Sequence, residues 1–383
     1  MKQVYCDNGS TSFPKAPGLG EAVGRHIDLN GFNISRGGYG KAYSLEAEII
    51  EAREQMCRLF GWDEPKGVVF TPGATMGLNM VLKGVLKKGD HVITTSMEHN
   101  AVVRPLTQLE EQGVEWSEAA CDVRGQLEAK SVEELIRENT KLVLVTHGSN
   151  VCGTLIPLEE IGKLCRKYGI MFAADAAQTA GSVVIDMKRY GLDAVVFPGH
   201  KGLMGPQGVG GMVLSDRIAR EMSPVFSGGT GSASDKEEMP SFLPDKFQPG
   251  TLNIPGIIGL KHSLGFIARE GLEGIMEKKR YITDMFLQDV CNMKGVKLAG
   301  LPTVDSRCAV VSIVFLNMDN AEAAYLLESE YGIMTRCGLH CAPHAHKTLG
   351  TFPEGTVRFS FGYFNTTNEI RYVVDALKDV ATR

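Results

Sequence analysis

The sequence predicts an α/β fold: a mainly parallel β-sheet flanked by helices, with a smaller α+β domain toward the C-terminus. Short, continuously apolar segments alternate with segments of helical period, which is typical of strands buried on both faces of a parallel sheet. The chain has 383 residues, more than one compact core usually holds. Its 43% hydrophobic and 22% charged residues are ordinary for a globular enzyme.

The alternation begins near Ser44, which is expected to cap a helix. The apolar positions from Leu45 to Phe60 then recur with helical period until Gly61. The sequence next predicts strands near residues 67–70, 92–95, 141–146, 169–174, 193–197 and 209–214, and helices after residue 75 and at 102–111 and 158–168. Strands and helices in turn indicate a sheet covered by helices.

Residues 227–250 interrupt this alternation with glycines, serines and prolines, and we expect a loop that is either a mobile lid or a subunit contact. Beyond the loop the sequence predicts helices within 256–293, a strand at 309–315, a helix at 321–330, a strand near Val357 and a last helix from Thr367. We therefore expect a large domain at 15–255 and a small domain at 256–383 together with residues 1–14.

Charge and cysteine content indicate which binding partners and which cellular compartment to expect. The 40 Lys and Arg residues against 45 Asp and Glu residues give a net charge of −5, without long runs of one sign. This argues against nucleic acid and membrane surfaces as partners. No segment reaches the length of a membrane span, and a cytoplasmic protein is expected. Nine scattered cysteines, an odd number, favour a reducing compartment over a disulfide framework.

Asp175 and Lys201 carry the first chemical signal. Asp175 follows the apolar run 169–174, and Lys201 comes shortly after the run 193–197. Two side chains at the ends of buried strands can converge on one ligand beyond the sheet edge. Catalysis by pyridoxal phosphate (PLP) needs this pair, because a lysine holds the cofactor as a Schiff base and an acid keeps the pyridine nitrogen protonated. Strand-end Asp and Lys residues without a cofactor are also common, so PLP is a working hypothesis here.

The segment from Thr71 to Thr75 supports this hypothesis. It follows an expected strand, contains Gly73 and precedes a helix. Such a turn presents free backbone N–H groups to a phosphate, and the helix dipole favours the negative charge. Taken alone, it is also an ordinary strand-to-helix turn.

The segment from Arg336 to His346 concentrates two cysteines and three histidines, and its glycine and proline predict a loop. Cys337, Cys341, His344 and His346 could bind zinc, or the two cysteines could form a regulatory disulfide. Alternatively, Cys341 is a nucleophile whose thiolate is favoured by Arg336 and by any protonated histidine. A loop without chemistry is the fourth interpretation.

Over nearly its whole length, the chain resembles the class V, fold-type I PLP-dependent enzymes, and specifically the group II cysteine desulfurases and selenocysteine lyases. Each motif is modest, but their order and spacing are specific, and they disfavour the zinc and disulfide interpretations. The motifs are Gly73–Thr75, Glu98–Asn100, Ser149–Thr154, Asp175–Gln178, Gly199–Lys201, Gly250–Thr251 with Asn253, Arg336–Ala342, and Arg358.

The resemblance implies roles around the cofactor ring. Lys201 would form the Schiff base and, once released by substrate, move the Cα proton. Asp175 would pair with the pyridinium nitrogen, Gln178 would hydrogen-bond the ring hydroxyl oxygen, and His99 would stack on the ring face. Lys201 and His99, with the nucleophile Cys341, are the implied catalytic residues.

The resemblance also implies a phosphate site made by Thr75 and His200, with Ala74 in the same motif. Thr251 would join this site from a neighbouring subunit, which implies a homodimer. The implied site contains no metal.

For the substrate, the resemblance implies that Asn150 and Arg358 hold the carboxylate, for which a guanidinium fork suits better than a lysine. Arg336 is a further implied contact, which also biases Cys341 toward the thiolate. Cys341 would attack the substrate sulfur, converting L-cysteine to L-alanine and keeping the sulfur as a persulfide for an acceptor protein.

Three positions depart from the family pattern. Pro198 stands where a hydroxyl residue often helps to bind phosphate, Leu339 replaces a polar or aromatic residue, and Cys337 replaces a common threonine. These changes leave cofactor use intact but leave the substrate open. The alternatives are a selenocysteine lyase, another class V lyase or aminotransferase, and a zinc-binding regulatory protein.

Overall fold

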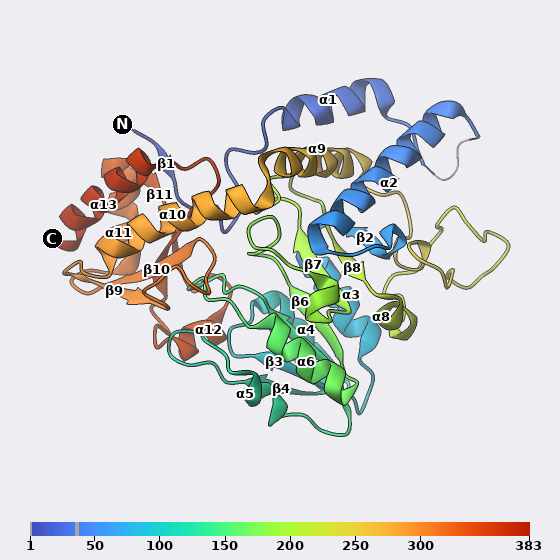
Figure 1. Ribbon diagram of the computed structural model, residues 1–383, viewed down its shortest axis with the longest axis horizontal. Coiled ribbons are helices and arrows are strands. Elements are labelled where there is room, and N and C mark those ends of the chain that lie inside the picture. The colour runs from blue at the N-terminus through green and yellow to red at the C-terminus, as the bar shows by residue number, and fades with distance from the viewer. Residues whose placement is uncertain (1, 35–37) are drawn as a thin grey trace.

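The computed structural model describes residues 2–34 and 38–383 and contains two main sheets (Figure 1). The larger sheet has seven strands in the order β2-β8-β7-β6-β5-β3-β4. Its strands are β2 (Val68–Thr71), β3 (His91–Thr95), β4 (Glu115–Ala119), β5 (Thr140–Thr146), β6 (Met171–Asp175), β7 (Ala194–Pro198) and β8 (Gly210–Leu214).

The larger sheet is mostly parallel, as predicted, with one exception. Strand β8 runs antiparallel to both of its neighbours, β7 and β2. The connection from Pro198 to Gly210 contains no helix, and a parallel crossover needs a dozen or more residues, usually with a helix. The return to the sheet is therefore antiparallel.

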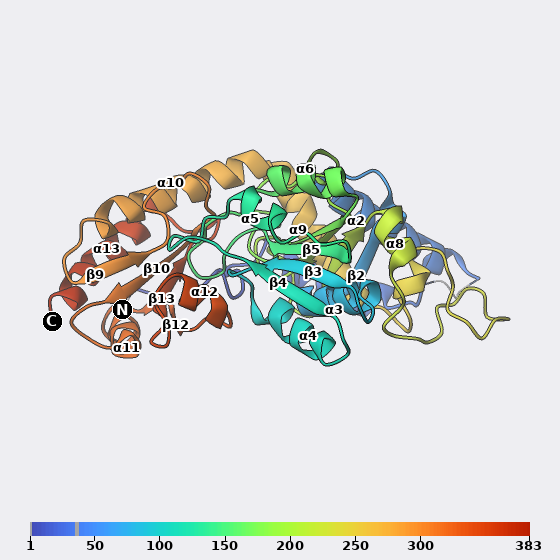
Figure 2. The ribbon, with the colours of Figure 1, turned by 90° about the horizontal axis from the view of Figure 1, so that it is seen from below.

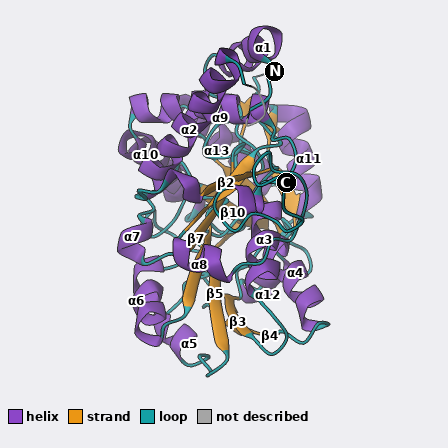
Figure 3. Ribbon diagram, turned by 90° about the vertical axis from the view of Figure 1, so that its right-hand side faces the viewer, coloured by secondary structure: helices purple, strands orange, loops and turns teal. Residues whose placement is uncertain are grey.

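Helices cover both faces of this sheet (Figure 3). Consecutive residues of a strand point to opposite faces, so Val143 and Val145 join one core with α2, α6 and α9, whereas Leu142 and Leu144 join a second core with α3 and α4. The helices are α1 (Leu19–Asn30), α2 (Gly40–Phe60), α3 (Ala74–Val85), α4 (Asn100–Glu110), α5 (Ala129–Glu133), α6 (Leu158–Tyr168), α7 (Met187–Tyr190), α8 (Asp216–Glu221) and α9 (Ile254–Glu270).

The predicted N-terminus of α2 was wrong. The helix begins at Gly40, and Ser44 lies inside it, where its hydroxyl donates to the Gly40 carbonyl over 3.0 Å. A serine within a helix often bonds back to a carbonyl four residues earlier, so it imitates a cap in the sequence. The predicted end is confirmed, because Gly61 adopts a left-handed φ of 61° after Phe60.

The second sheet has four antiparallel strands in the order β12-β13-β10-β9 and packs with its helices around a third core. The elements of this region are α10 (Leu272–Val290), β9 (Val296–Ala299), β10 (Val310–Phe315), α11 (Asn320–Tyr331), β11 (Ile333–Met334), β12 (Arg336–Gly338), α12 (Pro343–Thr348), β13 (Thr356–Ser360) and α13 (Thr367–Ala381). The first strand of the chain, β1 (Val4–Tyr5), pairs with β11, so the N-terminus lies in this C-terminal region (Figures 1 and 2).

The predicted division at residues 255 and 256 stays a prediction. Helix α9 begins at Ile254 and contributes Leu260 and Ile267 to the first core, beside α1 and α2. The residues from α10 onward mostly join the third core, and the long helix α10 runs from one region to the other (Figure 1).

Residues 227–250 form the expected loop, with only a short 3-10 turn, η2 (Asp245–Phe247), and extend outward beyond α8 in Figure 1. The segment 336–346 was predicted as a loop, but it begins with strand β12 and ends in helix α12. Only residues 339–342 between them are irregular. None of the helices in the described ranges has the length and apolar character needed to cross a membrane.

Candidate active site

The carboxyl ends of β6 and β7 bring Asp175 and Lys201 to one cavity of about 620 Å³. Parallel neighbouring strands end at the same sheet edge, which is why residues 26 positions apart in the chain meet there. The cavity is also lined by Ala74, Thr75, His99, Asn150, Gln178, Pro198 and His200. The structure therefore gathers most of the predicted cofactor residues around Lys201.

The charges of Asp175 and Lys201 are both perturbed by their surroundings. Asp175 is 2% exposed and its Oδ1 accepts a bond of 2.8 Å from the Ala177 N–H. Burial raises the pKa of Asp175, while that bond and Lys201 oppose the rise. Burial lowers the pKa of Lys201 to about 8, although Asp175 partly offsets the effect. A lysine with such a pKa is partly unprotonated near neutral pH and can act as a nucleophile.

His99 caps helix α4 with its side chain. The ring Nδ1 accepts a 3.0 Å bond from the Ala101 N–H, so any ring proton is on Nε2. Burial, assisted by the charges of Lys201 and Arg336, lowers the pKa of His99 to about 4. The ring is therefore neutral at physiological pH and fixed in orientation at the cavity wall.

The N-terminus of α3 opens into the same cavity. Gly73 precedes this helix and no side chain caps it, so the first N–H groups at Ala74 and Thr75 lack helical partners. His200 also lines the cavity, and its buried Nδ1 has no partner among the described residues. Free donors at a helix N-terminus suit a phosphate. With Lys201 and Asp175 at the other side of the cavity, this set of groups fits PLP.

Of two further predicted cofactor residues, Gln178 lies at the cavity and Thr251 does not. The amide of Gln178 lines the cavity, and its Nε2 donates to the Gly9 carbonyl over 3.1 Å. Thr251 is exposed and does not line the Lys201 cavity; it borders a separate pocket beside Phe226. The structure of one chain therefore does not bring Thr251 to its own Lys201.

The small domain contributes two arginines to the site. Arg336 on β12 and Arg358 on β13 lie directly opposite each other in the strand register. Like charges in this arrangement destabilise a sheet unless other groups compensate them. Arg358 is 1% exposed, and its Nη1 donates to the Asn150 carbonyl over 3.0 Å. Its Nη2 donates to Asp7 Oδ1 over 2.7 Å.

Cys341 lies in the irregular turn between β12 and α12, and its thiol is exposed. His340 and Cys341 both have left-handed backbone angles, with φ of 49° and 58°. This costly conformation is held by the large domain: Asn150 Nδ2 donates to the His340 carbonyl over 2.7 Å, and the Asn100 N–H donates to the Cys341 carbonyl over 2.8 Å. Arg336 Nη2 lies 3.5 Å from Cys341 Sγ.

The zinc and disulfide interpretations of this segment find no support. His344 contacts Glu118 over 2.6 Å, and His346 contacts Thr351 over 2.7 Å, so both histidines have other partners. No group of three or more metal-binding side chains occurs among the described residues. The cysteines, Cys337 and Cys341 included, are free thiols.

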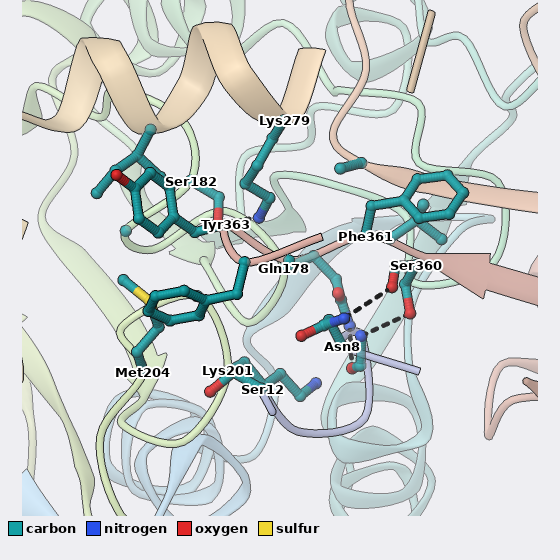
Figure 4. Close-up of a pocket in the computed structure, with 18 of the residues that line it drawn as sticks. Asn8, Ser12, Gln178, Ser182, Lys201, Met204, Lys279, Ser360, Phe361 and Tyr363 are labelled. Carbon is teal, nitrogen blue, oxygen red and sulfur yellow. Dashed lines mark hydrogen bonds between the residues drawn. The ribbon is translucent and has the colours of Figure 1, made fainter. Parts of the chain in front are cut away.

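The N-terminal segment completes the site, which was not predicted from the sequence. Asp7 pairs with Arg358, the Ser10 hydroxyl contacts both arginines, and Lys15 donates to the His200 carbonyl over 2.8 Å. Figure 4 shows Ser12 beside Lys201, and Asn8 joined to Ser360 of β13. The polar run after the short first strand was the available signal, but nothing local indicates which distant residues it contacts.

Glu98 was predicted only as part of the motif Glu98–Asn100, without a role of its own. It is fully buried beside the cavity. Its Oε1 accepts bonds of 2.6 Å from the Thr95 hydroxyl and 2.9 Å from the Thr146 N–H. Its Oε2 is buried without a partner among the described residues. Burial raises the pKa of Glu98 to about 8, and Asp175 adds to the rise, so the carboxyl is mostly protonated at neutral pH.

Comparisons with known proteins agree with this geometry. The class V aminotransferase family (Aminotransferase class-V) matches residues 4–373. A probable cysteine desulfurase of Methanothermobacter thermautotrophicus is 33% identical over 99% of this chain and 94% of its own length. A second, from Borreliella burgdorferi, is 29% identical over 98% of this chain and 91% of its own length.

Solved structures show the same relation. The apo cysteine desulfurase of Thermococcus onnurineus superimposes with a TM-score of 0.92 at 29% identity, covering 99% of this chain and 95% of that one. The Escherichia coli cysteine desulfurase CsdA superimposes with a TM-score of 0.88 at 26% identity, covering 99% and 94%. The fold is therefore that of the fold-type I enzymes, as predicted, and this chain belongs to the class V aminotransferase family.

Proposed function

We propose that this protein is a PLP-dependent cysteine desulfurase that converts L-cysteine to L-alanine and keeps the sulfur on Cys341. The observation that carries the proposal is the exposed Cys341 thiol, held 3.5 Å from Arg336 Nη2 and tied through Asn150 and Asn100 to the wall of the Lys201 cavity. An aminotransferase on this scaffold has no use for a thiol displayed in this way. The names of the similar proteins support the same activity.

Lys201 would hold PLP as a Schiff base, and its lowered pKa of about 8 supports this role. Asp175 would pair with the pyridinium nitrogen, His99 would lie on the ring face, and Gln178 would contact the ring hydroxyl with the N–H that Gly9 leaves free. When bound, PLP supplies the electron sink that stabilises negative charge at the substrate Cα. Lys201, freed by the substrate amine, would take and return the Cα proton.

The phosphate of PLP would lie at the N-terminus of α3, against Ala74 and Thr75 and the unpartnered Nδ1 of His200. Pro198 adds no donor there. Arg358 and Asn150 would hold the substrate carboxylate at the opposite side of the cavity, next to Cys341.

The sulfur transfer balances without a further reactant. Cys341 Sγ attacks the substrate sulfur, a new S–S bond forms, and the Cβ–S bond breaks with its electron pair going to the substrate carbon. Protons at Cβ and Cα then give alanine, while the thiol of Cys341 has become a persulfide. The substrate sulfur loses two electrons and is oxidised, and the substrate carbon gains the same two electrons and is reduced. Arg336 favours the attacking thiolate by charge.

We also propose a homodimer and an acceptor protein for the persulfide sulfur. Thr251 is exposed and lines a pocket next to the Lys201 cavity, and the exposed Phe226 borders both, which supports a second subunit seated there. The exposure of Cys341 supports transfer to another molecule. The cytoplasmic location and the domain boundaries remain predictions.

The test compares wild-type protein with Cys341→Ser and with a control, Cys291→Ser. The control changes another exposed cysteine, which does not line the Lys201 cavity. Each is incubated with L-cysteine and analysed for alanine and, by mass spectrometry, for a persulfide on Cys341. We expect both products in the wild type and the control, and neither in Cys341→Ser. Alanine without a persulfide, or a persulfide on another thiol, would contradict the proposal.

A further inference from the structure

The Ser10 hydroxyl lies at the centre of the charged groups on the substrate side of the cavity. It donates to Asp7 Oδ1 over 2.8 Å and accepts from Arg358 Nη2 over 2.8 Å and from Arg336 Nη1 over 3.1 Å. One donor and two acceptor positions are all that a hydroxyl has, so Ser10 is saturated. It also accepts a bond from each of the two arginines that β12 and β13 bring face to face, while Asp7 supplies the negative charge beside Arg358.

The donors of Arg358 are correspondingly occupied. Both N–H groups of Nη2 are used, one by Asp7 and one by Ser10. A guanidinium has two edges that can bind a carboxylate with two parallel bonds: one made of Nη1 and Nη2, the other of Nε and Nη2. Both edges include Nη2. A substrate carboxylate therefore cannot bind Arg358 through two bonds until one of the two bonds at Nη2 breaks.

We infer that Ser10 is a placeholder for the substrate carboxylate: the carboxylate displaces the Ser10 hydroxyl from Arg358, and the displacement also releases Arg336 toward Cys341. This inference rests on the proposed function, which assigns the carboxylate to Arg358. It makes Ser10 a positioning residue that connects the two ends of the substrate.

Ser10, rather than Asp7, is the partner that leaves. The bond to Asp7 joins two opposite charges, whereas the bond to Ser10 has a charge on the guanidinium alone, so the bond to Asp7 is the stronger of the two. Asp7 is also the acidic partner of the buried Arg358 charge, and removal of it would leave that charge uncompensated. An incoming carboxylate replaces a neutral hydroxyl at no loss of charge balance.

The release reaches Cys341 through Arg336. Arg336 divides its donors between Ser10 Oγ, over 3.1 Å, and Cys341 Sγ, over 3.5 Å. When Ser10 moves away, the Arg336 guanidinium loses its bond to the Ser10 hydroxyl, which competes with the Cys341 thiol for this side chain. It can then approach Sγ and stabilise the thiolate, so the nucleophile becomes more reactive when a substrate carboxylate is present.

The experiment uses the holoenzyme, Ser10→Ala, and two amines that differ only in the carboxylate: L-alanine and ethylamine. Binding is followed by the change in cofactor absorption. Removal of the competing hydrogen bond between the Arg358 guanidinium and the Ser10 hydroxyl should tighten L-alanine binding about tenfold in Ser10→Ala, without changing the affinity for ethylamine. Ser10→Thr, which keeps the hydroxyl, should resemble the wild type, as should Ser263→Ala, which removes a buried hydroxyl from α9.

A second measurement follows alkylation of Cys341 by iodoacetamide, read on the Cys341 peptide by mass spectrometry. L-Alanine should accelerate alkylation about threefold in the wild-type holoenzyme, as expected for a strengthened charge-assisted bond. Ser10→Ala should show the faster rate without ligand, even in the cofactor-free protein. Arg336→Gln, which keeps Ser10, should lose the effect of L-alanine, and it replaces Ser10→Ala if that variant does not fold.

Weaker or unchanged L-alanine binding in Ser10→Ala, or an equal change for ethylamine, would overturn the inference. So would an alkylation rate in Arg336→Gln that still responds to L-alanine. Neither measurement requires sulfur transfer. If a persulfide forms but Ser10→Ala has no effect, the inference fails and the proposed function stands. If Ser10→Ala has the expected effects but no persulfide forms, the proposed function fails and the inference about Ser10 stands.

Discussion

Glu98 should make the stability of this protein fall as the pH rises from mildly acidic to mildly alkaline. Its carboxyl accepts two hydrogen bonds at Oε1, but the negative charge of Asp175 acts against its ionisation, and no cation among the described residues offsets that charge. Burial therefore raises the pKa of Glu98 from 4.5 to about 8. The substitution to study is Glu98→Gln, because an amide oxygen accepts the same two bonds and the amide carries no charge at any pH.

The magnitude follows from the difference between the two states. Between pH 4.5 and 8 the folded protein keeps the Glu98 proton and the unfolded chain has lost it, so stability decreases as pH rises, by about 1.4 kcal/mol per unit. Over the whole interval the loss is roughly 5 kcal/mol, to order of magnitude. The loss of stability is complete above the pKa of Glu98 in the folded protein and absent below its pKa in the unfolded chain. Glu98→Gln removes this contribution entirely.

The assay is urea unfolding of the cofactor-free wild type and of Glu98→Gln at several pH values from 5 to 9 and at one protein concentration. The stability of the variant relative to the wild type should increase with pH up to about pH 8 and then level off. Glu111→Gln, at an exposed position just after α4, provides the matched control, because it makes the same chemical change outside the buried core. A flat difference for Glu98→Gln would refute the assignment of a neutral, buried carboxyl.

Three further predictions concern the site and the domain contact. Lys201→Ala should abolish cysteine turnover, measured as alanine release, and the rate at which PLP joins the wild-type apoprotein, measured by absorbance at the cofactor band, should fall below about pH 8, where the lysine is protonated. Cys341→Ala should lose alanine formation from L-cysteine more completely than from L-selenocysteine, since selenium is the better leaving group, and equal losses would contradict this. Gly153→Ala should lower the unfolding midpoint far more than Gly89→Ala. Both glycines have a left-handed φ, which costs an alanine about 1–2 kcal/mol. Only at Gly153 would the new Cβ also clash with a carbonyl, lying 2.3 Å from that of Val310.

Much of the cofactor end of the site could be predicted because it depends on strand direction alone. Asp175 and Lys201 each follow an apolar run, and parallel strands end at one edge, so their meeting required no knowledge of packing. The turn before α3 likewise follows from a strand, a glycine and a helical pattern. Local sequence determines both features.

The substrate end could not be predicted in this way. The ion pair between Asp7 and Arg358 joins residues 351 positions apart, which the pairing of β1 with β11 and the bridge from Asp7 to Ser360 of β13 place together. The register that sets Arg336 opposite Arg358 is likewise fixed by tertiary packing, not by any local pattern. Ser44 shows the reverse error, since a local rule was applied where the helix had already begun.

This difference has a consequence for how the site is assembled. The groups of one chain that would hold the cofactor all lie between Ala74 and Lys201, at the edge of the large sheet. Apart from Asn150, the groups that would hold the substrate carboxylate and the nucleophile come from the N-terminal segment and from β12, β13 and the turn at Cys341. Ser10 links Arg336 and Arg358 through its uncharged hydroxyl, which a ligand carboxylate can replace. The protein therefore separates a rigid cofactor support, whose geometry must not change, from an adjustable set of contacts around the substrate, where one exchange of partners can report that the correct molecule has arrived.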